Sequence, residues 1–134
     1  MSKCFFCDMA GGEKPGLILE DDEFFSVYDK APVSRGHALV IPKMHVDSFF
    51  DMQPEYASRL FRFLIATKRK IDERHRPDGY NIGVNDGAAA GRSIGHLHVH
   101  LIPRYERDVE NPDGGIRNIF PVHIPPTRPP AGYA

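Results

Sequence analysis

Tryptophan is absent from the 134-residue sequence, and cysteine occurs only twice, at Cys4 and Cys7. Apolar runs are short. None reaches the roughly 18 residues of a membrane-spanning helix, and the few apolar residues after Lys3 do not form a secretory signal. We therefore expect no membrane partner. Two cysteines in a chain without an export signal are typical of a reducing compartment and predict a cytoplasmic protein.

An excess of charge of either sign is also missing. The formal net charge is −1, so no basic field attracts a polyanion, and we expect no nucleic-acid partner. The sequence contains neither a Walker loop nor a GxGxxG motif, which excludes those two kinds of nucleotide site. Hydrophobic residues nevertheless make up 41% of the chain, and its length suffices for one domain with a real core.

Histidine and aliphatic residues alternate from His96 through Leu97, His98 and Val99 to His100. A period of two is the signature of a strand, so the three imidazoles share one exposed or cleft-lining face and the aliphatic side chains face a core. The strand rise places His98 roughly 6.6 Å and His100 roughly 13 Å from His96. Zinc–nitrogen bonds measure only about 2.0–2.1 Å, so all three cannot share one metal ion. At least one histidine is therefore available as an acid, a base or a nucleophile.

A loop over residues 85–93 leads directly into these histidines. It opens at Asn85 with an Asn-Asp-Gly sequence, which is first of all a turn signal. Its later residues suit an anion. The backbone at Gly91 can approach one closely, Arg92 offers a fork of donors, and Ser93 offers a hydroxyl.

Alternation and turn residues predict an antiparallel α+β domain. A short helix is expected over residues 4–10, ended by the glycines at 11 and 12. Pro54 suits the first position of a long helix, which the Pro-Asp-Gly at residues 77–79 ends. Strands are expected over residues 17–20, 24–28, 37–41, 80–84 and 96–102.

The composition of the chain changes after residue 110. Six of its 12 prolines lie between Pro112 and Pro130. We therefore divide the chain into one domain over residues 1–110 and a proline-rich extension over residues 111–134. The extension is expected to be extended and to dock on the body or on a partner chain.

Residues 96–102 match the His-φ-His-φ-His-φ-φ signature (φ, apolar) of the histidine triad (HIT) superfamily. Residues 4–9, 24–29, 32–43 and 85–93 also resemble segments of that family in its order and spacing, so the resemblance covers residues 4–105. On these motifs the chain is identified as a member of the nucleotide hydrolase branch, and residues 1–110 as a HIT domain. The resemblance implies an α+β, HIT-like antiparallel sheet of about five strands with one long and one short helix. It also implies a homodimer that joins two such sheets.

The resemblance implies a mechanism as well. The central His98 would attack the α-phosphorus of a nucleotide conjugate, and water would then release the nucleoside monophosphate from the nucleotidyl-histidine. His100 and His37 would orient His98 or bind phosphate oxygens. Ser93 and Arg92, with the backbone of their loop, would stabilise charge or the leaving group. No catalytic cofactor is required.

A nucleotide pocket is implied by the same resemblance. Aromatic and apolar side chains would sandwich the base, and Asp29 would accept hydrogen bonds from ribose hydroxyls. The implied nucleotide-binding residues are Phe5, Phe6, Met9, Val27, Asp29, Asn85, Gly91, Arg92, Ser93, His98 and His100. For the apolar members, an ordinary place in the core is an equally good interpretation.

A structural zinc site is also implied. In zinc-bearing HIT proteins the ligands are a cysteine pair, the histidine after Pro-Lys and the first triad histidine, which correspond here to Cys4, Cys7, His45 and His96. Two thiolates and two imidazoles form a closed tetrahedral site. A redox pair is a weaker interpretation, because no strand precedes the Cys-x-x-Cys segment. Cysteines that are merely packed are the other alternative.

Two positions bear on the substrate. Many HIT hydrolases carry glutamine where Arg92 stands, and a permanent cation there favours a longer polyphosphate or a more anionic leaving group. His100 keeps the histidine that the transferase branch replaces by glutamine, which favours hydrolysis. The substrate stays open between dinucleoside polyphosphates, nucleoside phosphoramidates and other conjugates. The alternative function is a nucleotide-binding, zinc-stabilised interaction protein with little turnover.

Overall fold

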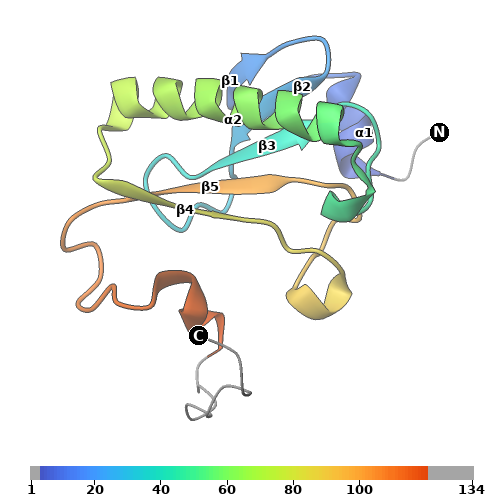
Figure 1. Ribbon diagram of the computed structural model, residues 1–134. Coiled ribbons are helices and arrows are strands. Elements are labelled where there is room, and N and C mark those ends of the chain that lie inside the picture. Colours follow the sequence, from blue (N-terminus) through green and yellow to red (C-terminus); the bar gives the residue numbers. More distant parts are fainter. Residues whose placement is uncertain (1–3, 121–134) are drawn as a thin grey trace.

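An open antiparallel sheet forms the centre of the molecule, in a computed structural model that describes residues 4–120 (Figure 1). The strands are β1 (Leu17–Glu20), β2 (Phe24–Tyr28), β3 (Ala38–Pro42), β4 (Gly79–Gly83) and β5 (Val99–Arg104). Their order across the sheet is β1-β2-β3-β5-β4, so β1 and β4 are its edges, and every neighbouring pair is antiparallel. The predicted α+β class with five strands and one long and one short helix is confirmed.

The long helix α2 (Pro54–His75) covers one face of the sheet (Figure 1). It begins at Pro54 as predicted, because the N–H that proline lacks would have no helical partner at that position. Its apolar side chains, among them Leu60 and Phe63, are buried on the strands. Their partners in this core cluster include Phe24, Val40, Leu97 and Val99.

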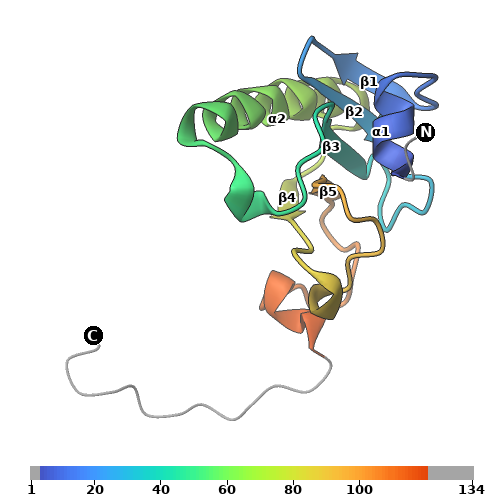
Figure 2. The same cartoon turned by 90° about the vertical axis from the view of Figure 1, so that its right-hand side faces the viewer.

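The short helix α1 (Phe5–Ala10) lies on the opposite face, as Figure 2 shows. Side chains alternate along β3, so Val40 packs in the cluster beneath α2 while Leu39 and Ile41 pack in the cluster beneath α1. Phe6 of α1 is buried in that second cluster. Because α1 has only 6 residues, it covers one end of its face.

The strand that carries the histidines begins later than predicted. The ladder of β5 starts at Val99, so His96 and His98 lie in the irregular segment before it. The carbonyl of His96 accepts a hydrogen bond from the ring of His98 at 2.8 Å, and the amide of Leu97 donates to the carbonyl of Val46 at 2.7 Å. These bonds replace regular pairing. The predicted alternation still holds for the aliphatic residues, since Leu97, Val99 and Leu101 are all buried.

The C-terminal part of the chain follows β5 through a tight turn. Arg104 binds the carboxylate of Asp108 there through hydrogen bonds of 2.7 and 2.9 Å, and a short 3-10 helix, η3 (Gly115–Ile119), comes next. Residues 121–134, including His123, lie outside the described residues. The expected docking of the extension and the boundary at residue 110 therefore stay predictions. Among the described residues, no helix combines the length and apolarity needed to cross a membrane.

Candidate functional site

The three histidines of the alternating segment lie on the α1 side of the sheet. The alternation predicted an exposed or cleft-lining face, and the first two histidines are buried in it. His96 is fully buried, and His98 retains only 8% exposure. The ring of Phe6 from α1 covers both, with ring centroids 5.8 Å from His96 and 5.1 Å from His98. His100 is half-buried, and its ring centroid lies 5.2 Å from that of His98. The aromatic cover explains why polar side chains here are shielded from water.

His98 is held in one tautomer by the backbone. Its Nδ1 lies 2.8 Å from the carbonyl oxygen of His96, and because a carbonyl only accepts, Nδ1 carries the proton and donates. In the neutral ring Nε2 therefore carries the lone pair. A lone pair fixed in direction is what a nucleophile or a general base requires.

His37 and His100 form a second pair, set by a backbone amide. The N–H of Val33 donates to His37 Nδ1 at 3.1 Å, so the proton of neutral His37 is on Nε2. That Nε2 lies 3.0 Å from His100 Nδ1 and 3.5 Å from Asp29 Oδ2. Burial lowers the pKa of both His37 and His100, and the Asp29 carboxylate opposes the shift in both. Both rings are thus held neutral near pH 7, and His100 Nε2 is left as a donor.

Cys4 and Cys7 meet His45 and His96 in one cluster, as the predicted ligand set requires. The four ligand atoms lie within 4.8 Å of one another. Cys4 Sγ is 3.2 Å from His96 Nδ1, and Cys7 Sγ is 3.3 Å from His45 Nδ1. A fourfold S₂N₂ donor set of this kind suits a tetrahedral metal ion such as zinc.

The tautomer of His96 also fits a metal ligand. Its Nε2 donates to the carbonyl of Pro42 at 2.7 Å, which leaves the Nδ1 lone pair directed at the thiols. Burial lowers the pKa of His96, which favours the neutral ring that a metal needs. Asp29, His37 and His100 are a second close group, but their bonding suits a metal less, because the Val33 amide already occupies the His37 Nδ1 lone pair.

Arg92 has a partner that the sequence did not indicate. Its Nη1 donates to the backbone carbonyl of Asp47 at 2.8 Å, and its Nη2 lies 3.4 Å from Asp47 Oδ1. Asn85, Gly91 and Ser93 of the same loop are exposed. The expected phosphate contacts of these residues stay predictions. Asp47 lies 45 residues away in sequence, and no local pattern pointed to it.

The residues expected around a nucleotide base fall into two groups. Phe6, Met9 and Val27 are buried in the core cluster beneath α1, which fits the ordinary-core interpretation, although Phe6 also contacts His98. Phe5 is 49% exposed, and Lys30 Nζ lies over its ring at 5.6 Å from the centroid. One carboxylate oxygen of Asp29 already accepts a hydrogen bond from the amide of Ala31 at 2.9 Å.

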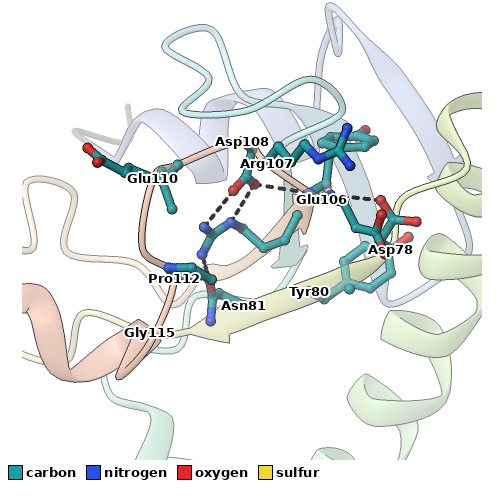
Figure 3. Close-up of a pocket in the computed structure, with 13 residues that line it drawn as sticks. Asp78, Tyr80, Asn81, Glu106, Arg107, Asp108, Glu110, Pro112 and Gly115 are labelled. Atoms are coloured by element: carbon teal, nitrogen blue, oxygen red, sulfur yellow. Dashed lines mark hydrogen bonds and ion pairs between the residues drawn. The ribbon is translucent and has the colours of Figure 1, made fainter.

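Of two cavities in the structure, one borders the cysteine and histidine cluster and the other lies apart from it. One of about 620 Å³ is lined by Cys4, Cys7 and His45 together with Ser93, so it joins the metal cluster to the 85–93 loop. Another, of about 760 Å³, lies between β4, the end of β5 and the turn after it (Figure 3). Arg104 crosses it to Asp108, and no described histidine lines it. This second cavity is not part of the histidine site.

Comparison with known proteins decides the family. Residues 12–107 match the HIT domain, which is more than half of the chain. The chain belongs to the HIT family. The histidine segment and the 85–93 loop lie within that match.

Several HIT proteins are similar over most of this chain. The adenylylsulfatase HINT3 of Arabidopsis thaliana is 40% identical over 106 residues, which are 78% of this chain and 54% of that protein. The chain thus spans about half of the Arabidopsis protein. An uncharacterized HIT-like protein of Methanocaldococcus jannaschii is 37% identical over 110 residues, 80% of this chain and 83% of the relative.

Solved HIT structures share the fold. A zinc-bound histidine triad protein from Mycobacterium smegmatis is 36% identical with a TM-score of 0.73, covering 81% of this chain and 80% of that one. A HIT family protein from Bacillus anthracis gives the same identity of 36% and a TM-score of 0.73, with 78% and 74% covered.

Proposed function

We propose that this protein hydrolyses nucleoside phosphate conjugates at the α-phosphorus, with His98 as the nucleophile. The observation that carries the proposal is the hydrogen bond from His98 Nδ1 to the His96 carbonyl, which leaves the Nε2 lone pair free to attack. In the first step Nε2 forms a bond to phosphorus, and the bond to the leaving group breaks with its electron pair. In the second step water attacks phosphorus, the P–N bond breaks, and a nucleoside monophosphate leaves.

His100 and His37 support both steps. The Val33 amide donates to His37 Nδ1, so His37 donates from Nε2 to His100 Nδ1. The proton of neutral His100 is therefore on Nε2, which can donate. A neutral donor beside the nucleophile suits a phosphate oxygen, where negative charge accumulates. His37 is a positioning residue in this scheme, since it acts through His100.

The substrate class is proposed from charge and from a relative. The relative named adenylylsulfatase acts on a conjugate of a nucleoside phosphate with an anion, and this chain shares its family. Arg92 and Ser93 follow the turn of the 85–93 loop, and a cation there suits an anionic leaving group. Dinucleoside polyphosphates, adenylyl sulfate and nucleoside phosphoramidates are therefore the substrates to compare.

A structural zinc ion is part of the proposal. Cys4, Cys7, His45 and His96 would hold it, and the zinc-bound Mycobacterium relative supports the assignment. The ion would tie α1 to the segments that carry His45 and His96. It would supply rigidity, because all four tetrahedral positions are taken by protein ligands.

A homodimer is also proposed. β4 is an edge of the sheet, and beside it lies an apolar groove of about 500 Å³ between α2, β4 and residues 49–52. Phe50, Phe61 and Ile82 line this groove with exposures of 82%, 61% and 50%. An apolar surface beside an open sheet edge suits a second copy of the chain, related by a twofold axis.

A substrate panel tests the proposed activity. Purified protein is incubated with diadenosine triphosphate, adenylyl sulfate and adenosine phosphoramidate, and released nucleoside monophosphate is measured. We expect release from at least one, and its loss in His98→Asn, while the variant keeps its melting temperature and its affinity for the monophosphate. Activity of His98→Asn close to wild type would exclude the nucleophile. Nucleotide binding without release from any conjugate would instead support the little-turnover binding protein.

A further inference from the structure

The 85–93 loop has little structure of its own. Its single 3-10 turn, η2 (Ala88–Ala90), lies between Gly87 and Gly91, whose φ angles of 90° and 92° are in the left-handed region. The backbone hydrogen bonds of η2 stay within residues 87–92. The position of the loop on the molecule therefore depends on its contacts with other segments.

Both ends of this loop are attached to one other segment, residues 46–49. Near its start, Asp86 accepts hydrogen bonds from the hydroxyl of Ser48 at 3.0 Å and from the amide of Phe49 at 2.8 Å. Shortly after its end, the amide of Leu97 donates to the carbonyl of Val46 at 2.7 Å. Residues 87–93, which include the exposed Gly91 and Ser93, lie between these two anchors.

Arg92 supplies an attachment between the anchors. Two of its nitrogens contact Asp47, Nη1 the backbone carbonyl at 2.8 Å and Nη2 the carboxylate at 3.4 Å. Two contacts from one planar guanidinium fix its orientation as well as its position. The Arg92 side chain is only 17% exposed, whereas that of Asp47 is 60% exposed.

The two segments that meet here, around Asp47 and around Leu97, also carry both histidines of the metal cluster. His45 lies two residues before Asp47, and His96 directly precedes Leu97. The backbone at Gly95 packs against the ion pair, since a Cβ there would lie 3.7 Å from Asp47 Oδ1 and 3.9 Å from Arg92 Nη2. The ion pair therefore lies between the metal cluster and the exposed part of the loop.

We propose that Asp47 is a positioning residue, which holds Arg92 and through it fixes residues 87–93 against the segment that carries His45. The inference rests on the proposed function in one respect, namely that Arg92 and Ser93 face the nucleotide. An ion pair whose carboxylate is 60% exposed contributes little to global stability. Its effect is local, because a loop that has few other contacts opens without unfolding the rest of the molecule.

The test compares Asp47→Asn with Asp22→Asn. The control removes the same charge from an exposed aspartate in the turn between β1 and β2, far from the loop in sequence. Amide hydrogen exchange of residues 87–93 and the Kd for a nucleoside monophosphate are measured. In Asp47→Asn we expect exchange in this segment to quicken about fivefold and the Kd to rise severalfold, with melting temperature and metal content unchanged. Asp22→Asn should match wild type in every measurement.

A double-mutant cycle completes the test. If Asp47 acts only through its contact with Arg92, Asp47→Asn has no further effect on exchange or Kd in the Arg92→Gln background. Unchanged exchange, or effects on exchange that add in full, would overturn the positioning role of Asp47. Faster exchange with an unchanged Kd would instead overturn the premise that Arg92 and Ser93 face the nucleotide. Exchange is measured without substrate. If the protein releases nothing from the conjugate panel but Asp47→Asn still quickens exchange of residues 87–93, the proposed function is overturned and the positioning role of Asp47 is kept.

Discussion

His37 Nε2 lies 3.0 Å from His100 Nδ1, and the backbone amide of Val33 decides which of these two nitrogens carries the proton. The amide donates to His37 Nδ1, so His37 must donate from Nε2 and His100 must accept at Nδ1. Protonation of either ring breaks this order. If His100 were protonated, its Nδ1–H would face the Nε2–H of His37. If His37 were protonated, its Nδ1–H would face the N–H of Val33.

Stability should therefore depend on pH through this pair. Burial lowers the folded-state pKa of His37 and His100 below the ordinary value of 6.5, so below that pH the unfolded chain binds more protons than the folded one. The free energy of unfolding is then highest above about pH 6.5 and falls as pH decreases through the lowered pKa values. Urea unfolding of wild type and His100→Asn at several pH values measures this. We expect a flatter pH dependence in the variant, and equal slopes would contradict the role of His100.

Metal removal should lower stability. Purified protein should contain about one zinc ion per chain, and Cys4→Ser should lose it and melt at a lower temperature. Serine keeps an oxygen that can accept the Cys7 amide as the Cys4 sulfur does, so the helix cap survives and the loss reports the metal. A chelator should lower the melting temperature of wild type and leave that of Cys4→Ser unchanged. Absence of zinc together with equal stability of both proteins would show that the cysteines are only packed.

Arg92→Gln should change the preference among leaving groups. A charge-assisted hydrogen bond to a distal phosphate contributes about 1.5–3 kcal/mol, so kcat/KM for a dinucleoside polyphosphate should fall about tenfold to a hundredfold. A single-phosphate adenosine phosphoramidate should lose less. Rates are compared at constant salt. Equal losses on both substrates would mean that Arg92 acts on the common α-phosphate or only on the loop.

Charge placed in the apolar groove should separate a dimer. Phe61→Glu puts a carboxylate among Phe50 and Ile82, which costs far more in an interface than in solvent. Light scattering should show the mass of a dimer for wild type and of a monomer for the variant. Leu17→Glu, on the opposite edge strand and similarly exposed, is the control and should stay dimeric. A monomeric wild type, or a dimer in Phe61→Glu, would contradict this interface.

Much of the fold could be read from local patterns. Strand alternation and turn residues predicted β1 and β2 at the residues where they occur, and Pro54 predicted the start of α2. The buried positions of Leu97 and Val99 also followed from the period of two. These features depend on neighbours in the sequence, which is why a single sequence reveals them. The start of β5 did not follow, because the bonds that replace its ladder at His96 and His98 involve Val46 and a side chain.

The sequence by itself determined which groups are available: two thiols, an alternating histidine segment and a turn rich in small residues. The period of two left open how these groups are divided; the family resemblance implied the division, and the tertiary structure brings it about. His96 turns to Cys4 and His45 while His100 turns to His37, although all three triad histidines share one period. Arg92 likewise meets Asp47, which no local pattern in the sequence indicated. Each of these partners comes from a segment tens of residues away, so its choice depends on how the sheet and loops bring the chain together.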